Sequence, residues 1–356
     1  MKKITALTTL MLLNPFLSFA QDTRDSDSPY GVLDFLHWDH PWNGHHYNKE
    51  KMEEAVQLMK RAGVGFVRMD FLWEDIEPRK NHLDYSKYDG IVDLLAQNDI
   101  KILGVLGYNV SWNSRAWNAA PDIPLFVKYA RRVVRRYKDR VKYWEIWNEP
   151  DVDIYWVPQD DMKTYGALLR AVYPALKSED PTCLVVMGAN SRYVPLGLRR
   201  LYMRAGKENF DIVNLHPFVD PLSPGAMELL RSAYRGTYKV MQSKADGDKP
   251  IWITEIGCPG VDEVADNWWL GKNPSEAEQA QWVKKVYGEP LKWKGVKKIF
   301  WAFFRDTPNH FGNGTDYFGL VRRDFSLKPA YMAYQAVATK QVKVKPAKVI
   351  DVDLDG

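Results

Sequence analysis

The sequence has few cysteines, little net charge and no long internal apolar run, and each shortage excludes a class of protein. Only Cys183 and Cys258 occur among 356 residues, so the chain is not a small domain held together by disulfides. No segment after the amino terminus reaches the length of about 20 apolar residues that a membrane-spanning helix needs. Lys and Arg number 49 and Asp and Glu 45, and the basic run at 131–136 fits the solvated face of a helix, so we expect no nucleic-acid partner.

The amino terminus has the pattern of a secretory signal peptide. Lys2 and Lys3 precede an apolar run over residues 4–19, and the small residue Ala20 stands before a polar stretch. We expect cleavage after Ala20, which makes residues 1–20 the signal peptide and 21–29 a linker. The run is short and polar chain follows it directly, so we expect a secreted or periplasmic protein without a membrane anchor.

From residue 30 onward, eight short β-branched or aromatic runs alternate with longer helical patterns. The predicted strands are 31–36, 65–69, 101–106, 141–147, 184–187, 211–215, 250–254 and 297–302. The predicted helices are 49–62, 84–97, 124–138, 159–179, 195–206, 225–245, 275–288 and 328–340. Alternation of this kind implies parallel strands joined by helical crossovers, and eight units predict an α/β protein with a (β/α)₈ TIM barrel fold. No repeat or linker divides residues 30–340, which form a single catalytic domain.

Two smaller features follow from this assignment. Cys183 enters a predicted strand at the bottom of the barrel and Cys258 follows one at the top, farther apart than the roughly 7 Å between Cα atoms that a disulfide spans. We therefore expect two free thiols, the first in the core and the second at the rim of the site. The C-terminal tail, 341–356, ends in residues that match the opening of a calcium loop but lack its distal acidic ligand, which favours a solvated tail.

Reactive side chains stand where predicted strands end, on the face that carries the active site of barrel enzymes. Glu149 follows the fourth strand, Glu255 ends the seventh, Arg68 lies near the end of the second, and His216 follows the sixth. Glu145, inside the fourth strand, is either a salt-bridge partner or a site residue. Two carboxyl groups at one end of a barrel are the minimum equipment for cleaving a glycosidic bond, one as proton donor and the other as nucleophile or base.

The two carboxyl groups need different environments to do this work. A proton donor near neutral pH needs a raised pKa, which partial burial among aromatic side chains would give Glu149. A nucleophilic carboxylate must stay ionised, which Arg68 within a few Å would favour for Glu255. Asn148 can hydrogen-bond a sugar hydroxyl beside the scissile bond, and Trp301 offers a flat apolar face to the sugar ring.

The runs Trp147-Asn148-Glu149-Pro150 and Thr254-Glu255-Ile256-Gly257 resemble the acid/base and nucleophile motifs of clan A glycoside hydrolases. The likeness covers nearly all of residues 30–340. It is greatest for the family 39 group, which holds β-xylosidases, α-L-iduronidases and bacterial exopolysaccharide hydrolases, and families 5 and 42 are neighbouring candidates. The resemblance implies that Glu149 acts first as acid and then as base, that Glu255 forms a covalent glycosyl-enzyme, and that no cofactor is needed.

The sequence departs from the clan pattern at one position. The resemblance implies that Arg68 contacts the nucleophile, and many clan members also place a tyrosine near the end of strand six, where its hydroxyl touches the nucleophile as well. This chain has Phe218 there. Control of Glu255 then falls to Arg68, to His216 or to a loop tyrosine such as Tyr108, and the sequence leaves these three open.

Tryptophan is abundant in the predicted loops of the active face. Seven of the fourteen tryptophans fall there: Trp38, Trp42, Trp112, Trp117, Trp156, Trp268 and Trp269. Aromatic faces attract the CH surfaces of sugars, so several of them, together with Tyr108, are expected to line subsites for a glycan. The segment 34–46 is rich in His and Asp but lacks a defined zinc spacing, so we expect a sugar-binding or surface loop and no metal.

These observations predict a retaining β-glycoside hydrolase that acts on an oligo- or polysaccharide by double displacement. A separation of about 5–5.5 Å between the carboxyl groups of Glu149 and Glu255 is expected, whereas about 6.5–9.5 Å would indicate inversion. The alternatives are a carbohydrate-binding barrel without turnover, a transglycosylase that uses the same residues, and a metal-dependent hydrolase built on 37–46. The sugar, the linkage, endo or exo attack and the oligomeric state stay open.

Overall fold

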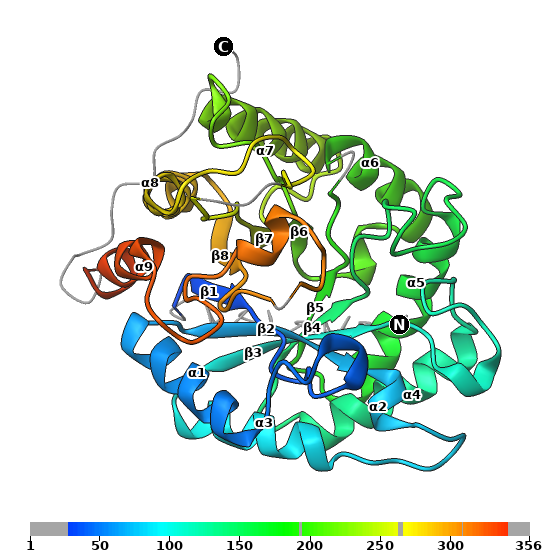
Figure 1. Ribbon diagram of the computed structural model, residues 1–356. Coiled ribbons are helices and arrows are strands. Elements are labelled where there is room, and N and C mark those ends of the chain that lie inside the picture. The colour runs from blue at the N-terminus through cyan, green and yellow to red at the C-terminus, as the bar shows by residue number, and fades with distance from the viewer. Residues whose placement is uncertain (1–27, 192–193, 263–265, 308, 341–356) are drawn as a thin grey trace, which may run out of the picture.

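The computed structural model describes residues 28–191, 194–262, 266–307 and 309–340, and these form a (β/α)₈ barrel (Figure 1). The predicted fold is therefore confirmed. The predicted signal peptide, nearly all of the linker and the C-terminal tail with its partial calcium motif lie outside the described residues.

Eight parallel strands pair in the order β5-β4-β3-β2-β1-β8-β7-β6. They are β1 Tyr30–Leu33, β2 Phe66–Leu72, β3 Lys101–Gly107, β4 Tyr143–Ile146, β5 Leu184–Met187, β6 Val213–Leu215, β7 Ile251–Ile256 and β8 Val296–Ala302. Isolated bridges from Val186 to Ile212 and from Asn190 to Leu215 join β5 to β6 and close the sheet on itself. All eight predicted strands are present and differ from the prediction only at their ends.

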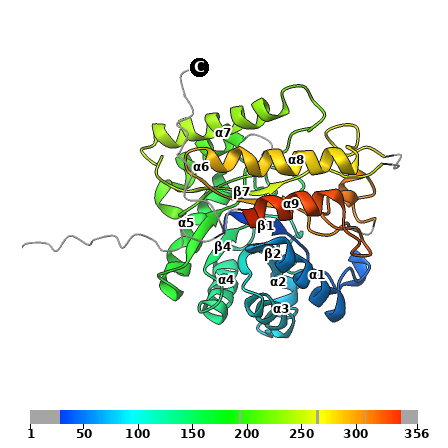
Figure 2. The ribbon, with the colours of Figure 1, turned by 90° about the vertical axis from the view of Figure 1, so that its left-hand side faces the viewer.

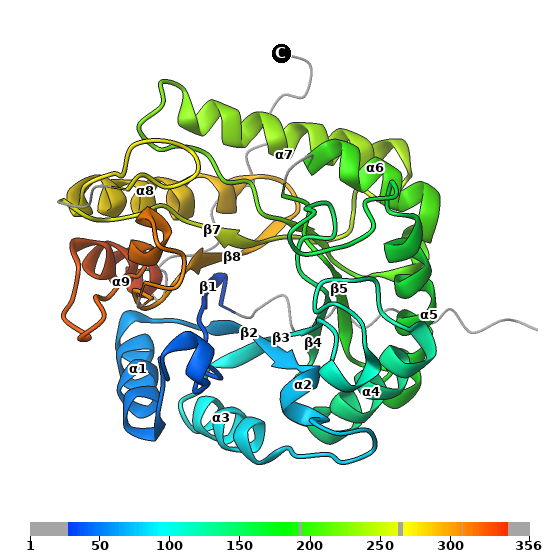
Figure 3. The same ribbon diagram turned by 45° about the vertical axis from the view of Figure 1, so that its right-hand side comes forward.

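Helices surround the sheet on its outside (Figures 1 and 3). They are α1 Lys49–Ala62, α2 Trp73–Ile76, α3 Ser86–Gln97, α4 Ile123–Tyr137, α5 Lys163–Glu179, α6 Val194–Ala205, α7 Ala226–Ser243, α8 Glu276–Gly288 and α9 Pro329–Lys340. Among the α-helices of the described residues, only the single turn α2, directly after β2, has no counterpart in the prediction. Figure 2 shows α9 between α8 and α1, which completes the ring of helices. In the described part of the chain, no helix is both long enough and apolar enough to cross a membrane.

Local signals explain where the helices begin and end. The Asn48 side chain accepts a hydrogen bond from the backbone of Lys51 at the start of α1, and Gly63, with a φ of 82°, ends the helix in the left-handed conformation that glycine adopts without strain. At the start of α8, Ser275 and Glu278 form a reciprocal capping box. The caps fix the lengths of the helices, and so the positions at which the chain enters the next strand.

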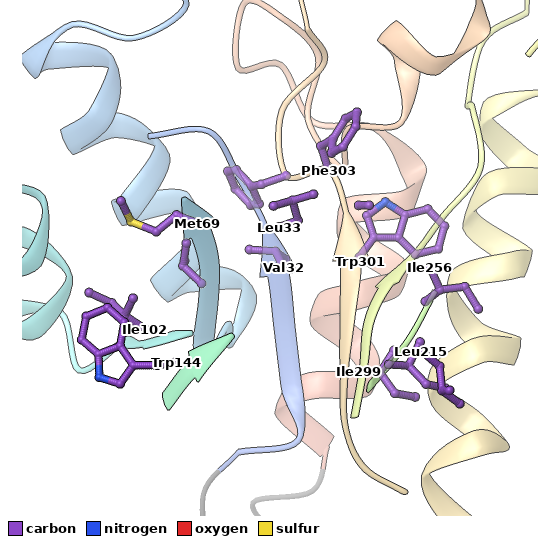
Figure 4. Close-up of a cluster of buried hydrophobic side chains, with 14 of the residues drawn as sticks. Val32, Leu33, Met69, Ile102, Trp144, Leu215, Ile256, Ile299, Trp301 and Phe303 are labelled. Carbon is purple, nitrogen blue, oxygen red and sulfur yellow. The ribbon is translucent and has the colours of Figure 1, made fainter. Parts of the chain in front are cut away.

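The core has two apolar layers. The outer layer lies between sheet and helices, and Figure 4 shows part of it, with Val32, Ile256 and Ile299 among the labelled side chains. The inner layer fills the barrel itself with seven buried side chains: Phe66, Leu103, Tyr143, Val186, Ile212, Trp252 and Phe300. We call this inner layer the plug. Both cysteines are free thiols, as predicted, and both are buried, Cys258 two residues after the end of β7.

Candidate active site

A polar layer lies directly above the plug inside the barrel. Side chains alternate along a strand, so a residue two positions after a plug residue points into the barrel one layer closer to the C-terminal face. Four polar residues occupy such positions on β2, β4, β6 and β7: Arg68, Glu145, Asn214 and Thr254. All four are buried, and buried polar groups need partners. Their hydrogen bonds lead upward to the two glutamates.

Arg68 connects the polar layer to Glu255. Its Nε and Nη2 donate to the two carboxylate oxygens of Glu145 at 2.7 and 2.9 Å. Its Nη1 donates to Oε1 of Glu255 at 2.6 Å, and its Nη2 also donates to Oδ1 of Asn148 at 2.8 Å. The bidentate pair with Glu145 fixes the plane of the guanidinium. Glu145 is thus a buried salt-bridge partner beneath the site. Arg68 contacts Glu255, as the resemblance implies, and it contacts Asn148 as well.

Glu149 reaches the site because the backbone leaves the regular strand conformation after β4. Trp147 and Glu149 both have left-handed φ values, 66° and 43°, which are uncommon for residues other than glycine and concentrate at functional sites. The indole nitrogen of Trp147 donates to the carbonyl of Tyr155 at 2.8 Å and holds this turn. Strand alternation therefore ends here, and the neighbouring Asn148 and Glu149 both reach groups inside the barrel, Arg68 and His216 respectively.

His216 lies between the two glutamates. Its Nδ1 is 2.6 Å from Oε1 of Glu149 and 3.7 Å from Oε1 of Glu255. The ring is fully buried, and burial lowers the pKa of His216 to about 4, so the imidazole is neutral at pH 7. His216, the residue after β6, thus contacts Glu149, the expected acid/base. Of the three candidates for the role of the absent tyrosine hydroxyl, Arg68 makes the hydrogen bond to Glu255.

The two glutamates are close together and differ in surroundings. One oxygen from each carboxylate and a ring nitrogen of His216 all lie within 4.8 Å of one another. Such closeness fits the short separation of about 5–5.5 Å between carboxyl groups in retaining enzymes better than the separation of roughly 6.5–9.5 Å in inverting ones. Burial raises the pKa of Glu149 to about 7. Burial also raises the pKa of Glu255, while the charge on Arg68 opposes the rise.

The histidine-rich segment after β1 does not assemble a metal-binding set. Within the described ranges, Glu149, His216 and Glu255 are the side chains close enough together to share a metal ion. His37 lies instead with its Nε2 3.8 Å from Oδ2 of Asp70. Burial lowers the pKa of His37 to about 3 and raises that of Asp70 to about 6. The segment therefore supplies an uncharged imidazole beside a third carboxyl group at the mouth.

The three aromatic residues predicted to bind substrate, Trp301, Trp38 and Tyr108, differ in how deeply they are buried. Trp301 is fully buried in the outer layer, beside Ile256 in Figure 4, and its indole nitrogen donates to the carbonyl of Phe318 at 2.8 Å. The structure contradicts the expected sugar-binding face of Trp301, because Phe300 and not Trp301 points into the barrel. Trp38 is covered too, stacked on Phe35 with ring centroids 3.8 Å apart. Tyr108 is half-buried beside Trp147 and Trp117.

Three loop tryptophans do expose their rings. Trp42, Trp117 and Trp269, in the loops after β1, β3 and β7, are 57%, 50% and 54% exposed. The other loop tryptophans pack into the protein, among them Trp156 at 1% and Trp268 at 3%. The exposed tryptophans are therefore the ones that stay candidates for stacking on a sugar. The sequence does not distinguish exposed from buried loop tryptophans, because exposure depends on how the loops pack on one another.

Sequence comparison gives matches in one clan of enzymes. The family model described as beta-galactosidase, glycoside hydrolase family 42, matches residues 41–107. The chain is 29% identical to a phospho-cellobiase of Klebsiella oxytoca over 112 residues, which are 29% of this chain and 24% of that protein. It is 23% identical to beta-glucosidase A of Thermotoga maritima over 234 residues, 56% of this chain and 52% of that protein. The chain resembles the clan A glycoside hydrolases. The resemblance that its motifs indicated is thereby confirmed.

Solved structures of glycoside hydrolases share the fold across nearly the whole barrel. A family 39 glycoside hydrolase from Bacteroides cellulosilyticus WH2 matches with a TM-score of 0.71 and 22% identity over 90% of this chain and 65% of that one. A monomeric beta-xylosidase from Caulobacter crescentus CB15 matches with a TM-score of 0.67 and 18% identity over 88% and 68%. The chain thus spans about two thirds of these structures, and about a quarter and a half of the two curated relatives.

Proposed function

We propose that this protein is a retaining β-glycoside hydrolase that acts on an oligo- or polysaccharide. One observation carries the proposal: two carboxyl groups, with an oxygen of each within 4.8 Å of the other, have opposite partners, a neutral histidine on Glu149 and a guanidinium on Glu255. The first partner suits a carboxyl group that must keep its proton, and the second suits one that must stay ionised. This asymmetry supports Glu149 as the proton donor and Glu255 as the nucleophile.

In the first half of the reaction, Glu149 gives its proton to the glycosidic oxygen while a carboxylate oxygen of Glu255 attacks the anomeric carbon. The bond to the leaving group breaks, and the sugar is left as an ester on Glu255. In the second half, the Glu149 carboxylate takes a proton from water, and the water oxygen attacks the same carbon and releases Glu255. Two displacements at one carbon return its original configuration. Asn148 binds a hydroxyl of the reacting sugar in this mechanism, and its hydrogen bond from Arg68, which fixes the side chain, supports that role.

The substrate class and location are part of the proposal. The exposed rings of Trp42, Trp117 and Trp269 offer stacking surfaces on three loops of the active face, which supports a glycan longer than one sugar. Relatives named beta-glucosidase, beta-galactosidase and beta-xylosidase support a β-linkage. The signal-peptide pattern at residues 1–20 supports action in the periplasm or outside the cell.

The test is a screen of the purified protein on aryl β-glycosides and a polysaccharide panel, with the anomer of the first product read by NMR. Retention is expected, and activity should survive a chelator. An accepted glycoside carrying fluorine at carbon 2 should stall the ester and add its mass to the peptide with Glu255. An inverted product would exclude the double displacement. Binding without hydrolysis would favour a carbohydrate-binding barrel. Products longer than the substrate at high acceptor concentration would favour a transglycosylase.

A further inference from the structure

A chain of three hydrogen bonds runs from the polar layer to Glu149. The hydroxyl of Thr254, on β7, donates to Oδ1 of Asn214, on β6, at 2.8 Å. The same hydroxyl oxygen lies 2.8 Å from Nε2 of His216. The other ring nitrogen, Nδ1, lies 2.6 Å from Oε1 of Glu149. Asn214, Thr254 and His216 are completely buried and Glu149 nearly so, which leaves solvent no part in these bonds.

The direction of each bond follows from the number of hydrogens available. A threonine hydroxyl has one hydrogen, and that of Thr254 points to Asn214. Its oxygen can therefore only accept from His216, so the hydrogen of the imidazole is on Nε2. A neutral imidazole has a lone pair on its other nitrogen. The hydrogen between Nδ1 and Glu149 must then belong to the carboxyl group.

We infer that Thr254 and Asn214 are positioning residues which hold His216 in its Nε2–H tautomer and thereby keep the acid proton on Glu149. The inference rests on the proposed function for its catalytic meaning, since it describes how the proton donor of that reaction is held ready. A carboxylate on Glu149 would face a lone pair at 2.6 Å, which disfavours ionisation. The low pKa of His216, about 4, agrees with a neutral ring.

Other charged or titratable groups also face this pair. They come from β2, β4, β7 and the loop after β4: Arg68, Glu145, Glu255 and Tyr155. Arg68 favours the ionised form of Glu149, whereas Glu255 and Glu145 favour a protonated His216. Substitution of Thr254 or Asn214 by an apolar residue changes none of these charges. A shift in the ionisation of Glu149 in such a variant is then attributable to the hydrogen-bond chain.

The most direct test of the tautomer is Asn214→Leu, which keeps the Thr254 hydroxyl but removes its acceptor. The hydroxyl should then turn and donate to Nε2 of His216. The ring hydrogen consequently moves to Nδ1, and Nδ1–H donates to a Glu149 carboxylate. The basic limb of kcat/KM against pH should then move down by roughly one pH unit. Thr254→Val removes the hydroxyl both as donor to Asn214 and as acceptor from His216, so it should move the basic limb down as well. Thr254→Ser keeps the hydroxyl and should leave the basic limb at its wild-type pH. An unmoved limb, or one that moves up, overturns the inference.

A second measurement does not depend on turnover. Long-range ¹⁵N–¹H spectra distinguish the two tautomers of a neutral histidine, and with seven histidines in the chain a His216→Gln variant identifies the signals of His216. The wild type should show Nε2–H, and Asn214→Leu should show Nδ1–H. An Nδ1–H tautomer in the wild type would overturn the inference even in an active enzyme. An Nε2–H tautomer that switches in a protein without hydrolase activity would uphold the chain and reject the proposed function.

A matched control separates the shift of the basic limb from the general effect of replacing a buried threonine by valine. Thr237, in α7, is also completely buried, and its hydroxyl donates to the carbonyl of Ala233, away from the site. Thr237→Val should leave the pH profile and the His216 spectrum unchanged. Thermal unfolding of every variant confirms a folded barrel. If Thr237→Val moved the basic limb as far as Thr254→Val, the shift would not come from the chain and the inference would fall.

Discussion

Nη1 of Arg68 donates a hydrogen bond to Oε1 of Glu255 at 2.6 Å, and other nitrogens of the same guanidinium donate to Glu145 and Asn148. The same cation therefore anchors the floor of the site and faces the proposed nucleophile. Its side chain is 3% exposed and that of Glu145 is 0% exposed. Because Glu145 is fully buried, removal of Arg68 leaves its charge without compensation, whereas Arg68 without Glu145 would still pair with Glu255.

The Arg68–Glu145 pair gives a prediction that separates stability from catalysis. Arg68→Met should lower the free energy of unfolding by about 3–5 kcal/mol, because Glu145 is left as an unpaired buried charge. The double variant Arg68→Met/Glu145→Gln should recover much of that stability but little activity, since Glu255 still lacks its cation. Urea unfolding and kcat/KM measure the two effects. A double variant with restored activity would show that Arg68 serves only as an anchor.

The pH dependence of hydrolysis follows from the two carboxyl groups. The proton donor is active in its acid form, so kcat/KM should fall as the pH rises through about 7, the pKa of Glu149. The nucleophile is active when ionised, so activity should also fall at low pH, with an acid limb above the usual value for glutamate because burial raises the pKa of Glu255. A pH profile of kcat/KM tests both limbs. A rate that stays level to pH 9 would contradict the assignment of Glu149.

Glu149→Gln should affect substrates according to their leaving groups. A poor leaving group needs a proton, and loss of general acid catalysis should lower its kcat/KM by about 10²–10⁴-fold. A nitrophenolate departs without a proton, so the first step on a nitrophenyl glycoside should be impaired much less. Steady-state and burst kinetics on the two substrate types give the comparison. Equal losses on both would mean that Glu149 does not protonate the leaving group.

The tryptophans of the active face should divide by exposure. Trp117→Ala removes a half-exposed ring, so stability should change by less than about 0.5 kcal/mol while KM for an oligosaccharide rises several-fold, as the loss of one stacking contact of about 1 kcal/mol predicts. Trp301→Ala empties a buried position and should cost about 3–5 kcal/mol of stability. Thermal unfolding and KM on matched substrates distinguish the two. Loss of affinity without loss of stability in Trp301→Ala would restore its expected role at the sugar.

Much of the barrel could be predicted because parallel strands that are buried on both faces appear as short apolar runs. The same property explains the error at Trp301. When both faces of β8 are apolar, the pattern does not tell which of Phe300 and Trp301 points into the barrel. The motifs that carry Glu149 and Glu255 could be recognised because they stand at strand ends. The contacts of Thr254 and Asn214 could not be predicted, because a contact between neighbouring strands depends on register, which the spacing within one strand does not contain.

The plug has a consequence for the order of events in the reaction. With Phe66, Trp252 and Phe300 packed beneath the polar layer, the two glutamates lie above a filled barrel interior, and substrate and water reach them from the C-terminal face. In the proposed mechanism, a sugar bound to Glu255 covers the glutamates on that side, so the hydrolytic water follows the path that the leaving group has vacated. In that mechanism, the molecule that takes the place of the leaving group, water or a second sugar, receives the glycosyl group, so access to this position decides between hydrolysis and transfer.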